Sequence, residues 1–381
     1  MQTSRRNFMR IAGGTAILLA ANSCTSGPNY PDPRLPWHSA ETETDPMRFA
    51  LAHALLAPNP HNRQPWMVDL LSPTEAILYC DPTKDLPATD PFDRQITIGL
   101  GCFLELFTMA AANQGYRAEL DLFPEGSDQV TLDNRPIAKL QLHLDDTIQS
   151  DPLFAQVFAR RTNRGVFTEQ KPTLEDLNQI VESNNNIRTG YAISEPEVAA
   201  LRALAVEAAR IEFETPHTYM ESVHLMRIGN QEIAANPDGL SLEGPAMGLL
   251  NKIGIVTRET LADPTSSAFK QGLQQYQKAA NSSAAFVWII TPDNSREQQI
   301  AAGRAYIRQN LAATELGLSM HPLSQALQEY PEMAEMLTQV HGLTGSTGQR
   351  LQMFARLGYA KSKQPAPRYP LSAKIITHGK T

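Results

Sequence analysis

Two polar segments carry the side chains of this chain that are best suited to hold a ligand. The first, APNPHNRQPW, runs from Ala57 to Trp66, and its side-chain amides can both donate and accept hydrogen bonds. The second, RRTNRGVF, runs from Arg160 to Phe167, and each guanidinium is a planar fork that can hold two oxygens of an anion. A single arginine is more often a solvated surface charge, so we infer a site only from the whole segments. Each segment occurs in one half of the chain, which predicts one composite site.

A repeat with a fixed spacing of 202 residues relates the two halves. Five residues of the first half recur in the second: Arg94, Gly101, Ala110, Ala111 and Gly115 return as Arg296, Gly303, Ala312, Ala313 and Gly317. Two copies of one unit in one chain predict a fused dimer. We expect the first unit at residues 44–151 and the second at 152–381, because 381 residues exceed the roughly 250–300 at which one core stops growing.

Helices and strands are expected in both units, which predicts an α+β fold. In the first unit, Asp45 and Pro46 begin a helix that Pro58 ends. A long helix is expected at 94–113, and strands are expected at 66–71, 75–80, 117–123 and 137–144. In the second unit, helices are expected at 152–160 and 295–316, and Ser194 with Glu197 forms a capping box for a long helix to about residue 228. The apolar run 284–291 predicts a strand that is buried on both faces.

Composition and motifs exclude several classes of function. The net charge is −7 and no basic cluster occurs beyond the N-terminus, which excludes a nucleic-acid footprint. The chain has neither CxxC nor HExxH, and its nine histidines are scattered, so a zinc site has no support. A GxSxG elbow is absent, and Gly99-x-Gly101 lacks the third glycine of a dinucleotide-binding turn. Cys80 and Cys102 lie in apolar runs and would form either a disulfide or two buried thiols.

The first 24 residues are typical of an export signal. Ser4 to Arg10 form an S-R-R-x-F-M-R run before an apolar stretch from Ile11 to Ala21, the pattern that the twin-arginine export machinery recognises. A short membrane anchor or a fortuitous basic start are the alternatives, but the apolar stretch has only about half of the ~20 residues that span a bilayer. We therefore expect an exported, periplasmic protein that acquires a cofactor before export.

The segment after this signal predicts an attachment to the membrane. Cys24 follows Ala21, Asn22 and Ser23 in an imperfect lipoprotein box, so a lipid anchor at Cys24 is an open alternative to a free periplasmic protein. Residues 25–43 contain several prolines, which predicts an extended, non-helical tether.

The two polar segments resemble motifs of the nitroreductase family. APNPHNRQPW is similar to the family's flavin loop, usually A-P-S-x-x-N-x-Q-P-W, and RRTNRGVF is similar to its R-R-S-x-R-x-F phosphate motif. In ordinary members each chain has both motifs, and two chains pair so that each FMN lies between them. This chain has one motif per half and thus resembles the internally duplicated, Acg-like branch, over about residues 47–376. The resemblance implies a three-layer fold of two fused half-units, one FMN and a monomer.

The resemblance also implies which residues bind FMN. Along the flavin it implies Pro58, Asn59, Pro60, Asn62 and Gln64. Here Asn59 and Pro60 replace the family's serine pair, and Pro60 has no N–H to donate. On the phosphate it implies Arg160, Thr162, Arg164, Arg356 and Arg368. Ser324 and Gln325 stand where the family usually has Glu-Gly beside the flavin N5. No catalytic side chain is implied, because the flavin carries the chemistry.

Two functions remain open at this point. One is an FMN-dependent oxidoreductase that reduces a nitro compound, a quinone or a similar small electron-poor substrate. The other is a flavin-holding protein with little turnover, because the Acg-like branch is noted for a lid over the flavin and for poor use of nicotinamide donors. Residues 235–267 are the candidate lid, since they are longer than most connections in a compact domain. A plain surface insertion is the alternative for this segment.

Overall fold

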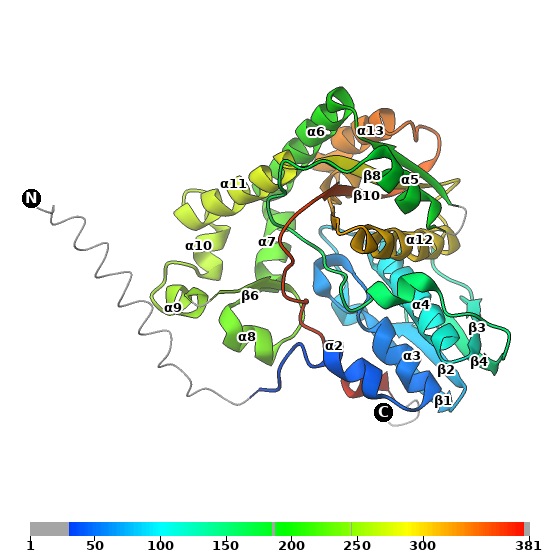
Figure 1. Cartoon of the computed structure of the whole chain (residues 1–381). Coiled ribbons are helices and arrows are strands. Elements are labelled where there is room, and N and C mark those ends of the chain that lie inside the picture. The colour runs from blue at the N-terminus through cyan, green and yellow to red at the C-terminus, as the bar shows by residue number, and fades with distance from the viewer. Residues whose placement is uncertain (1–29, 185–186, 245, 377–381) are drawn as a thin grey trace, which may run out of the picture.

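Two sheets enclose a pair of long helices in the computed structural model, which describes residues 30–184, 187–244 and 246–376 (Figure 1). The first sheet has the order β11-β1-β2-β4-β3, with β11 (Ile375–Ile376), β1 (Trp66–Ser72), β2 (Glu75–Cys80), β4 (Ala138–Leu144) and β3 (Tyr116–Leu122). The second has the order β5-β8-β10-β9, with β5 (Arg188–Ala192), β8 (Ala285–Thr291), β10 (Arg350–Gly358) and β9 (Ser319–Pro322). A short parallel pair joins β6 (Met226–Ile228) and β7 (Leu240–Leu242).

The two sheets repeat one topology, which confirms the predicted duplication. β1-β2-β4-β3 and β5-β8-β10-β9 are both antiparallel throughout, and in each the third strand of the sheet is the last in the chain. The helices between the second and third strands of each unit are α4 (Arg94–Asn113) and α12 (Arg296–Glu315). Each has 20 residues, and their first residues are the repeated arginines. The expected ranges 94–113 and 295–316 are thus confirmed.

Helices α4 and α12 cross where the repeated glycines meet. A Cβ on Gly101 would lie 2.3 Å from the carbonyl oxygen of Ile300, and a Cβ on Gly303 would lie 2.0 Å from that of Ile98. Ile98 and Ile300 are themselves 202 residues apart, so the crossing is nearly symmetric. Only glycine permits so close an approach of two backbones. The repeat in the sequence therefore marks a pseudo-twofold axis between the units.

The repeated arginines tie each unit to the other. Arg94 is fully buried and donates to the carbonyl oxygens of Leu327 and Gln352, each at 2.8 Å. Arg296 is equally buried and donates to the carbonyl oxygens of Phe92 at 2.9 Å and Asp128 at 3.0 Å. Buried carbonyl oxygens need a hydrogen-bond donor. Each guanidinium thus supplies that donor to carbonyl oxygens of the opposite unit.

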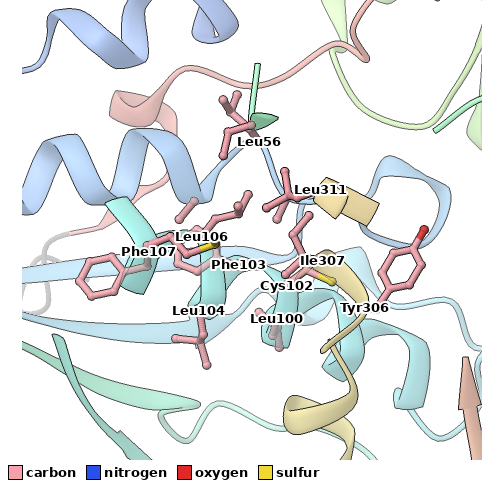
Figure 2. Packing of buried hydrophobic residues seen from close by; sticks show 14 of the residues in the cluster. Leu56, Leu100, Cys102, Phe103, Leu104, Leu106, Phe107, Tyr306, Ile307 and Leu311 are labelled. Atoms are coloured by element: carbon pink, nitrogen blue, oxygen red, sulfur yellow. The ribbon is translucent and has the colours of Figure 1, made fainter. Parts of the chain in front are cut away.

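The main core extends across both units. Apolar side chains of α4 interdigitate with those of α12, and Figure 2 shows Phe103 and Leu100 close to Ile307 and Leu311. Among the described residues α4 is long and apolar enough for a membrane span, but it is the buried central helix of this core. Cys80 and Cys102 are buried free thiols, which confirms the second of the two alternatives. Cys102 donates to the carbonyl oxygen of Gly303 at 3.2 Å.

The last strand interlocks the units. β11, at the end of the second unit, pairs in parallel with β1 of the first, with Val68 opposite Ile375 and Asp69 opposite Ile376. The buried Lys374 just before it donates to the carbonyl oxygen of Gln64 at 2.7 Å. The first sheet is therefore completed by the C-terminal segment of the chain.

A large helical insertion distinguishes the second unit. Between β5 and β8, where β1 and β2 have only a tight turn, it contains α6 (Glu195–Glu214), α7 (Pro216–Leu225), α8 (Gly229–Ala235), α9 (Met247–Lys252), α10 (Arg258–Ala262) and α11 (Ser267–Asn281). The expected single helix from 194 to about 228 is wrong. Thr215 adopts an extended backbone before Pro216, because a proline inside a helix lacks the N–H and clashes with the preceding turn.

The remaining helices pack mainly on other helices. They are α2 (Pro36–Ser39), α3 (Pro46–Ala54), α5 (Leu174–Glu182) and α13 (Ala334–Leu343). Of these, α3 packs on α4, α5 on α12 and α13 on α6. The helix expected at 152–160 is instead a short 3-10 turn over Pro152–Gln156. The expected extended tether is also wrong for its described part, residues 30–43. Pro36 is accommodated in the first turn of α2, where a proline costs nothing, and the buried Trp37 anchors this helix. The signal, residues 1–24, and Cys24 lie outside the described residues.

Candidate functional site

The first polar segment forms a tight loop after α3. Asp45 caps the start of α3 by accepting the N–H of Arg48, and the chain turns at Pro58. His61, Asn62 and Gln64 then adopt φ angles of 45°, 52° and 52°, a left-handed conformation that is uncommon for residues other than glycine. Such a backbone persists only where its surroundings hold it.

Side-chain amides hold this loop to neighbouring segments. Gln64 donates to the carbonyl oxygen of Pro237 at 2.7 Å and accepts the N–H of Tyr369 at 2.9 Å. Asn62 donates to the carbonyl oxygen of Pro367 at 3.1 Å, and Asn59 accepts the N–H of Gln64 at 2.7 Å. These amides therefore position the loop. Direct contact of the predicted residues Pro58, Asn59, Pro60, Asn62 and Gln64 with a ligand stays a prediction.

Arg160 reaches from the second polar segment to this loop. Its guanidinium is buried and donates to the carbonyl oxygen of Leu56 at 2.9 Å. Its Nε has no hydrogen-bond partner among the described residues. Burial lowers the pKa of Arg160 to about 10, so the side chain stays charged at neutral pH. A buried, charged donor without a partner is costly, and an anion would satisfy it.

Arg164 also lacks a partner. It makes no hydrogen bond or ion pair within the described part of the chain, and water reaches its side chain. Enough protein nevertheless surrounds it for desolvation to lower the pKa of its guanidinium. The Arg164 guanidinium is thus an accessible cation without a protein partner among the described residues. Thr162, between the two arginines, pairs with Met320 at the edge of β9 and is half-buried.

Arg368 and Arg356 are bound by protein atoms. Arg368 donates to the carbonyl oxygens of Leu55 at 2.8 Å and Ala57 at 2.9 Å, and to Asn62 Oδ1. Burial, with the nearby charge of Arg160, lowers the pKa of Arg368 to about 9. These contacts orient the first polar segment, so Arg368 positions this loop through its backbone.

Arg356 supports the second polar segment. It donates to the carbonyl oxygens of Gly165 at 2.7 Å and Asn163 at 3.2 Å, and its Nε bonds to His321 Nδ1 at 3.0 Å. Its guanidinium also lies 3.9 Å from the ring centre of Phe167. All of its nitrogens are occupied, so the structure gives Arg356 the role of shaping the segment. It is not free to hold an anion as the sequence predicted.

The two polar segments meet, as the single composite site requires. Arg160 contacts the backbone of the first-unit loop at Leu56. Burial first, and then the charge of Arg164, lowers the pKa of His61 to about 3, so the Arg164 guanidinium acts electrostatically on that loop. One site is thus assembled from both units.

The Ser324-Gln325 pair joins this arrangement from the end of β9. Ser324 precedes a short 3-10 turn that begins at Gln325, and its hydroxyl makes no hydrogen bond among the described residues. Tyr276 of α11 donates to Gln325 Oε1 at 2.5 Å. The Tyr276 hydroxyl also acts electrostatically on Arg164. Tyr276 therefore connects Gln325 with the surroundings of Arg164.

Comparison with known proteins shows which proteins the chain is similar to. The chain is 25% identical to a Mycobacterium tuberculosis protein with the provisional name NAD(P)H nitroreductase Rv3131. The aligned 344 residues cover 89% of this chain and 92% of that protein. It is 36% identical over 89 residues to another from that organism, provisionally named NAD(P)H nitroreductase acg, over 23% of this chain and 27% of that protein. Both of these proteins are named as nitroreductases. No family model matches this chain.

Solved structures of nitroreductases are more distant. A crystal structure named as a nitroreductase from Anabaena variabilis covers 87% of this chain and 90% of its own at 12% identity, with a TM-score of 0.41. The FMN-dependent nitroreductase NfnB from Mycobacterium smegmatis, in complex with NADPH, covers 56% of this chain and 92% of its own at 17% identity, with a TM-score of 0.35.

The protein has a buried polar network that sequence analysis missed. Glu212 of α6 accepts a hydrogen bond from Gln328 at 3.1 Å, and Gln325 and Ser222 also hydrogen-bond to its carboxyl group. Burial raises the pKa of Glu212 to about 7. Ser222 Oγ lies 3.4 Å from His61 Nε2, and His61 Nδ1 is buried without a partner among the described residues. The network connects Gln325 with the first polar segment.

A pattern in the sequence marks Glu212. It continues the apolar face of α6 that is formed by Leu201, Ala205 and Ala208, where helical spacing places a buried residue. A carboxyl group in that position is unusual and signals a function or a buried hydrogen-bond network. No pattern in the sequence indicated a role for His61, because any residue can occupy that position of the A-P-S-x-x-N-x-Q-P-W motif.

The candidate lid, residues 235–267, contacts the site. Gly239 N–H donates to the carbonyl oxygen of Asn62 at 3.3 Å, and Pro237 accepts from Gln64. Asp238 is buried and forms ion pairs with Lys84 at 2.9 Å and Arg227 at 2.6 Å. Burial alone would raise the pKa of Asp238, but these cations hold it below its usual range. The segment 237–239 is therefore fixed against the first-unit loop.

Proposed function

We propose that the chain binds one FMN in the composite site and acts as an oxidoreductase of the nitroreductase type. The observation that carries the proposal is the pair of unsatisfied cations, Arg160 and Arg164, which the second unit presents to the loop of the first. A phosphate would satisfy both, since guanidinium groups bind phosphate oxygens by charge-assisted hydrogen bonds. The names of the relatives, which describe NAD(P)H nitroreductases, support the same conclusion.

The residues present fit this cofactor in three respects. Arg160, Arg164 and the hydroxyl of Thr162 would hold the phosphate. The loop from Pro58 to Gln64, with its fixed left-handed backbone, would hold the flavin ring through main-chain groups. Ser324 and Gln325 would approach the ring from β9. When bound, FMN would accept two electrons from a donor and pass them to the substrate.

Protein groups would supply and control protons during such a reduction. A nitro compound or a quinone that accepts a hydride also needs a proton. The Glu212 carboxyl holds a proton up to about pH 7 because burial disfavours its charged form. It lies two hydrogen bonds from His61, which stays neutral. These groups place a proton source in the network that joins Gln325 with the loop after α3, without adding a charge.

The cofactor is the decisive test. The purified chain should be yellow and should release one FMN on denaturation, because the two motifs can meet only once. Flavin absorbance against protein concentration gives the ratio. Two flavins per chain, or none after expression in a flavin-replete host, would contradict the composite site.

A flavin-holding function with little turnover is the second candidate. The contacts of the segment 237–239 favour it, because they hold part of the candidate lid against the first-unit loop. Dithionite should reduce the bound flavin in either case. Rapid oxidation of NAD(P)H with a nitro or quinone acceptor would identify an enzyme. If Asp238→Asn gains that activity while the wild type lacks it, the lid restricts access and the holding function is supported.

We also propose export through the twin-arginine pathway, supported by the Arg5-Arg6 pair and the short apolar stretch after it. This pathway carries folded proteins, which agrees with a cofactor that must be bound between two interlocked units. Arg5→Lys with Arg6→Lys should leave the precursor in the cytoplasm. Periplasmic accumulation of this double variant would contradict the proposal. Labelling with radioactive palmitate, compared with Cys24→Ser, tests the lipid anchor.

A further inference from the structure

An N-terminal segment packs against Arg160, which we assign to the phosphate, and against Arg368, which supports the loop after α3. We call residues 33–40 the strap. Its Trp37 is only 4% exposed, and its ring centre lies 5.8 Å from the guanidinium carbon of Arg160 and 5.6 Å from that of Arg368. A third guanidinium, of Arg161, lies 5.0 Å away. Cations at this distance are attracted to the face of an indole ring, and the attraction grows where water is excluded.

Hydrogen bonds hold the strap along the C-terminal segment. Trp37 Nε1 donates to the carbonyl oxygen of Ala366 at 2.8 Å. The N–H of Arg368 donates to the carbonyl oxygen of Pro33 at 2.8 Å, and Arg34 Nε donates to that of Pro365 at 2.9 Å. The indole therefore has both its polar end and its backbone fixed, so the ring keeps its place over Arg160 and Arg368.

The strap also contacts the candidate lid. Arg34 forms an ion pair with Glu243, which follows β7 within residues 235–267. The lid contacts the first-unit loop through Gln64 and Asn62, and the strap contacts the arginines behind that loop. The two coverings of the site are thereby joined at their edges.

We propose that the strap closes the phosphate end of the cofactor site, with Trp37 as the residue that positions Arg160 and Arg368. This inference rests on the proposed function. Both guanidinium groups are buried, and burial first, then the charge of Arg160, lowers the pKa of Arg368, so an aromatic face close to both reduces the cost of keeping them buried. The cofactor would then enter before the strap docks, and its release would require the strap to leave.

The release rate of FMN tests this proposal in the full chain. Trp37→Ala should raise the dissociation rate at least about tenfold, since it removes two buried cation–aromatic contacts. Trp37→Phe keeps an aromatic face and should restore a rate close to that of the wild type. Leu35→Ala is the matched control, because Leu35 lies in the same strap and is 51% exposed. Recovery of flavin fluorescence after dilution measures the rate.

Two further measurements distinguish an effect of the strap from an effect of the lid and from a loss of folding. Glu243→Gln removes the charge of the strap–lid pair and should change the rate little, because a partly exposed ion pair contributes only about 0–1 kcal/mol, or up to fivefold. Far-ultraviolet circular dichroism of each variant monitors the fold. A folded Trp37→Ala protein that releases FMN at the wild-type rate would overturn the strap alone. A wild type that holds no FMN would overturn the proposed function and the strap together.

Discussion

At the scale of residues, the four predicted arginines of the site fall into two pairs with different roles. The N–H groups of Arg368 and Arg356 donate to backbone carbonyl oxygens in or beside the two polar segments. Arg160 and Arg164 keep donors free. The first pair shapes the loops, and the second pair can bind an anion. Which arginine belongs to which pair depends on tertiary contacts between residues some 100 to 300 positions apart, so the motif alone could not distinguish them.

Substitution should separate the two roles. Arg164→Ala should weaken FMN binding by about 2–5 kcal/mol, or roughly 30-fold or more, because it removes a charge-assisted hydrogen bond to phosphate. The melting temperature of its apoprotein should stay unchanged. Arg356→Ala should lower that melting temperature, because the carbonyl oxygens of Gly165 and Asn163 lose their donors. Titration with FMN and thermal unfolding of both apoproteins give the comparison. Equal FMN affinity in Arg164→Ala and wild type would remove Arg164 from the phosphate site.

Glu212 should make stability depend on pH in a defined direction. Its pKa rises from 4.5 to about 7 on folding, because burial disfavours the carboxylate. Its contribution is therefore fully present below pH 4.5 and is lost as the pH rises through 7. Glu212→Gln cannot ionise, so its stability relative to wild type should increase by about 3 kcal/mol between pH 5 and pH 9. Denaturant unfolding at several pH values measures this difference, with Glu214→Gln on the same helix as the control. A constant difference across this range would show that Glu212 does not titrate with folding.

At the scale of elements, the repeated helices govern how closely the units approach. Gly101→Ala would place a Cβ 2.3 Å from the carbonyl oxygen of Ile300, and a backbone atom cannot move aside as a side chain can. We expect a loss of about 3 kcal/mol or more in the free energy of unfolding. Gly342→Ala is the matched control, because no atom lies within 4 Å of a Cβ there, and alanine should favour helix α13 by up to about 1 kcal/mol. Urea unfolding measures both. Similar stability of Gly101→Ala and wild type would mean that the helices can separate freely.

The elements that the sequence predicted well are those with a local cause. Helix α4 and strands β1, β2 and β8 follow from hydrophobic periodicity and from flanking caps or turns, and their observed bounds lie within a residue or so of the expected ones. The errors arose where tertiary contacts outweigh composition. Prolines at 33 and 36 suggested an extended tether, but Trp37 finds a buried place against the C-terminal segment. The undivided helix to about residue 228 is an error of another kind. Pro216 predicts a break from the local sequence alone, because a proline disrupts a helix interior.

At the scale of the whole molecule, one chain has taken over the task of two subunits. The pseudo-twofold axis passes between Gly101 and Gly303, yet the polar segments have diverged so that one side supplies the loop and the other the cations. The helical insertion and the strand β11 also occur on one side only. A fused dimer can lose symmetry in this way, because its two halves no longer share one sequence. The sequence revealed the duplication through its fixed spacing, whereas β11 is too short to be predicted without its partner strand.

This architecture predicts that the intact chain is a monomer and that neither half binds flavin. Residues 45–151 expressed alone would expose the apolar faces of α4 and the edge of β1, and residues 152–381 would leave α12 and β11 without partners. Obligate dimer interfaces of this kind bury about 2,000–5,000 Å², so each half should be aggregated or unfolded alone. Light scattering of the intact chain, and flavin content and circular dichroism of each half, test the expectation. Co-expression of both halves should restore a yellow complex, because β11 can then pair with β1. A stable, flavin-loaded single half, or an intact chain that dimerises through α4 and α12, would show that the two units do not replace two subunits.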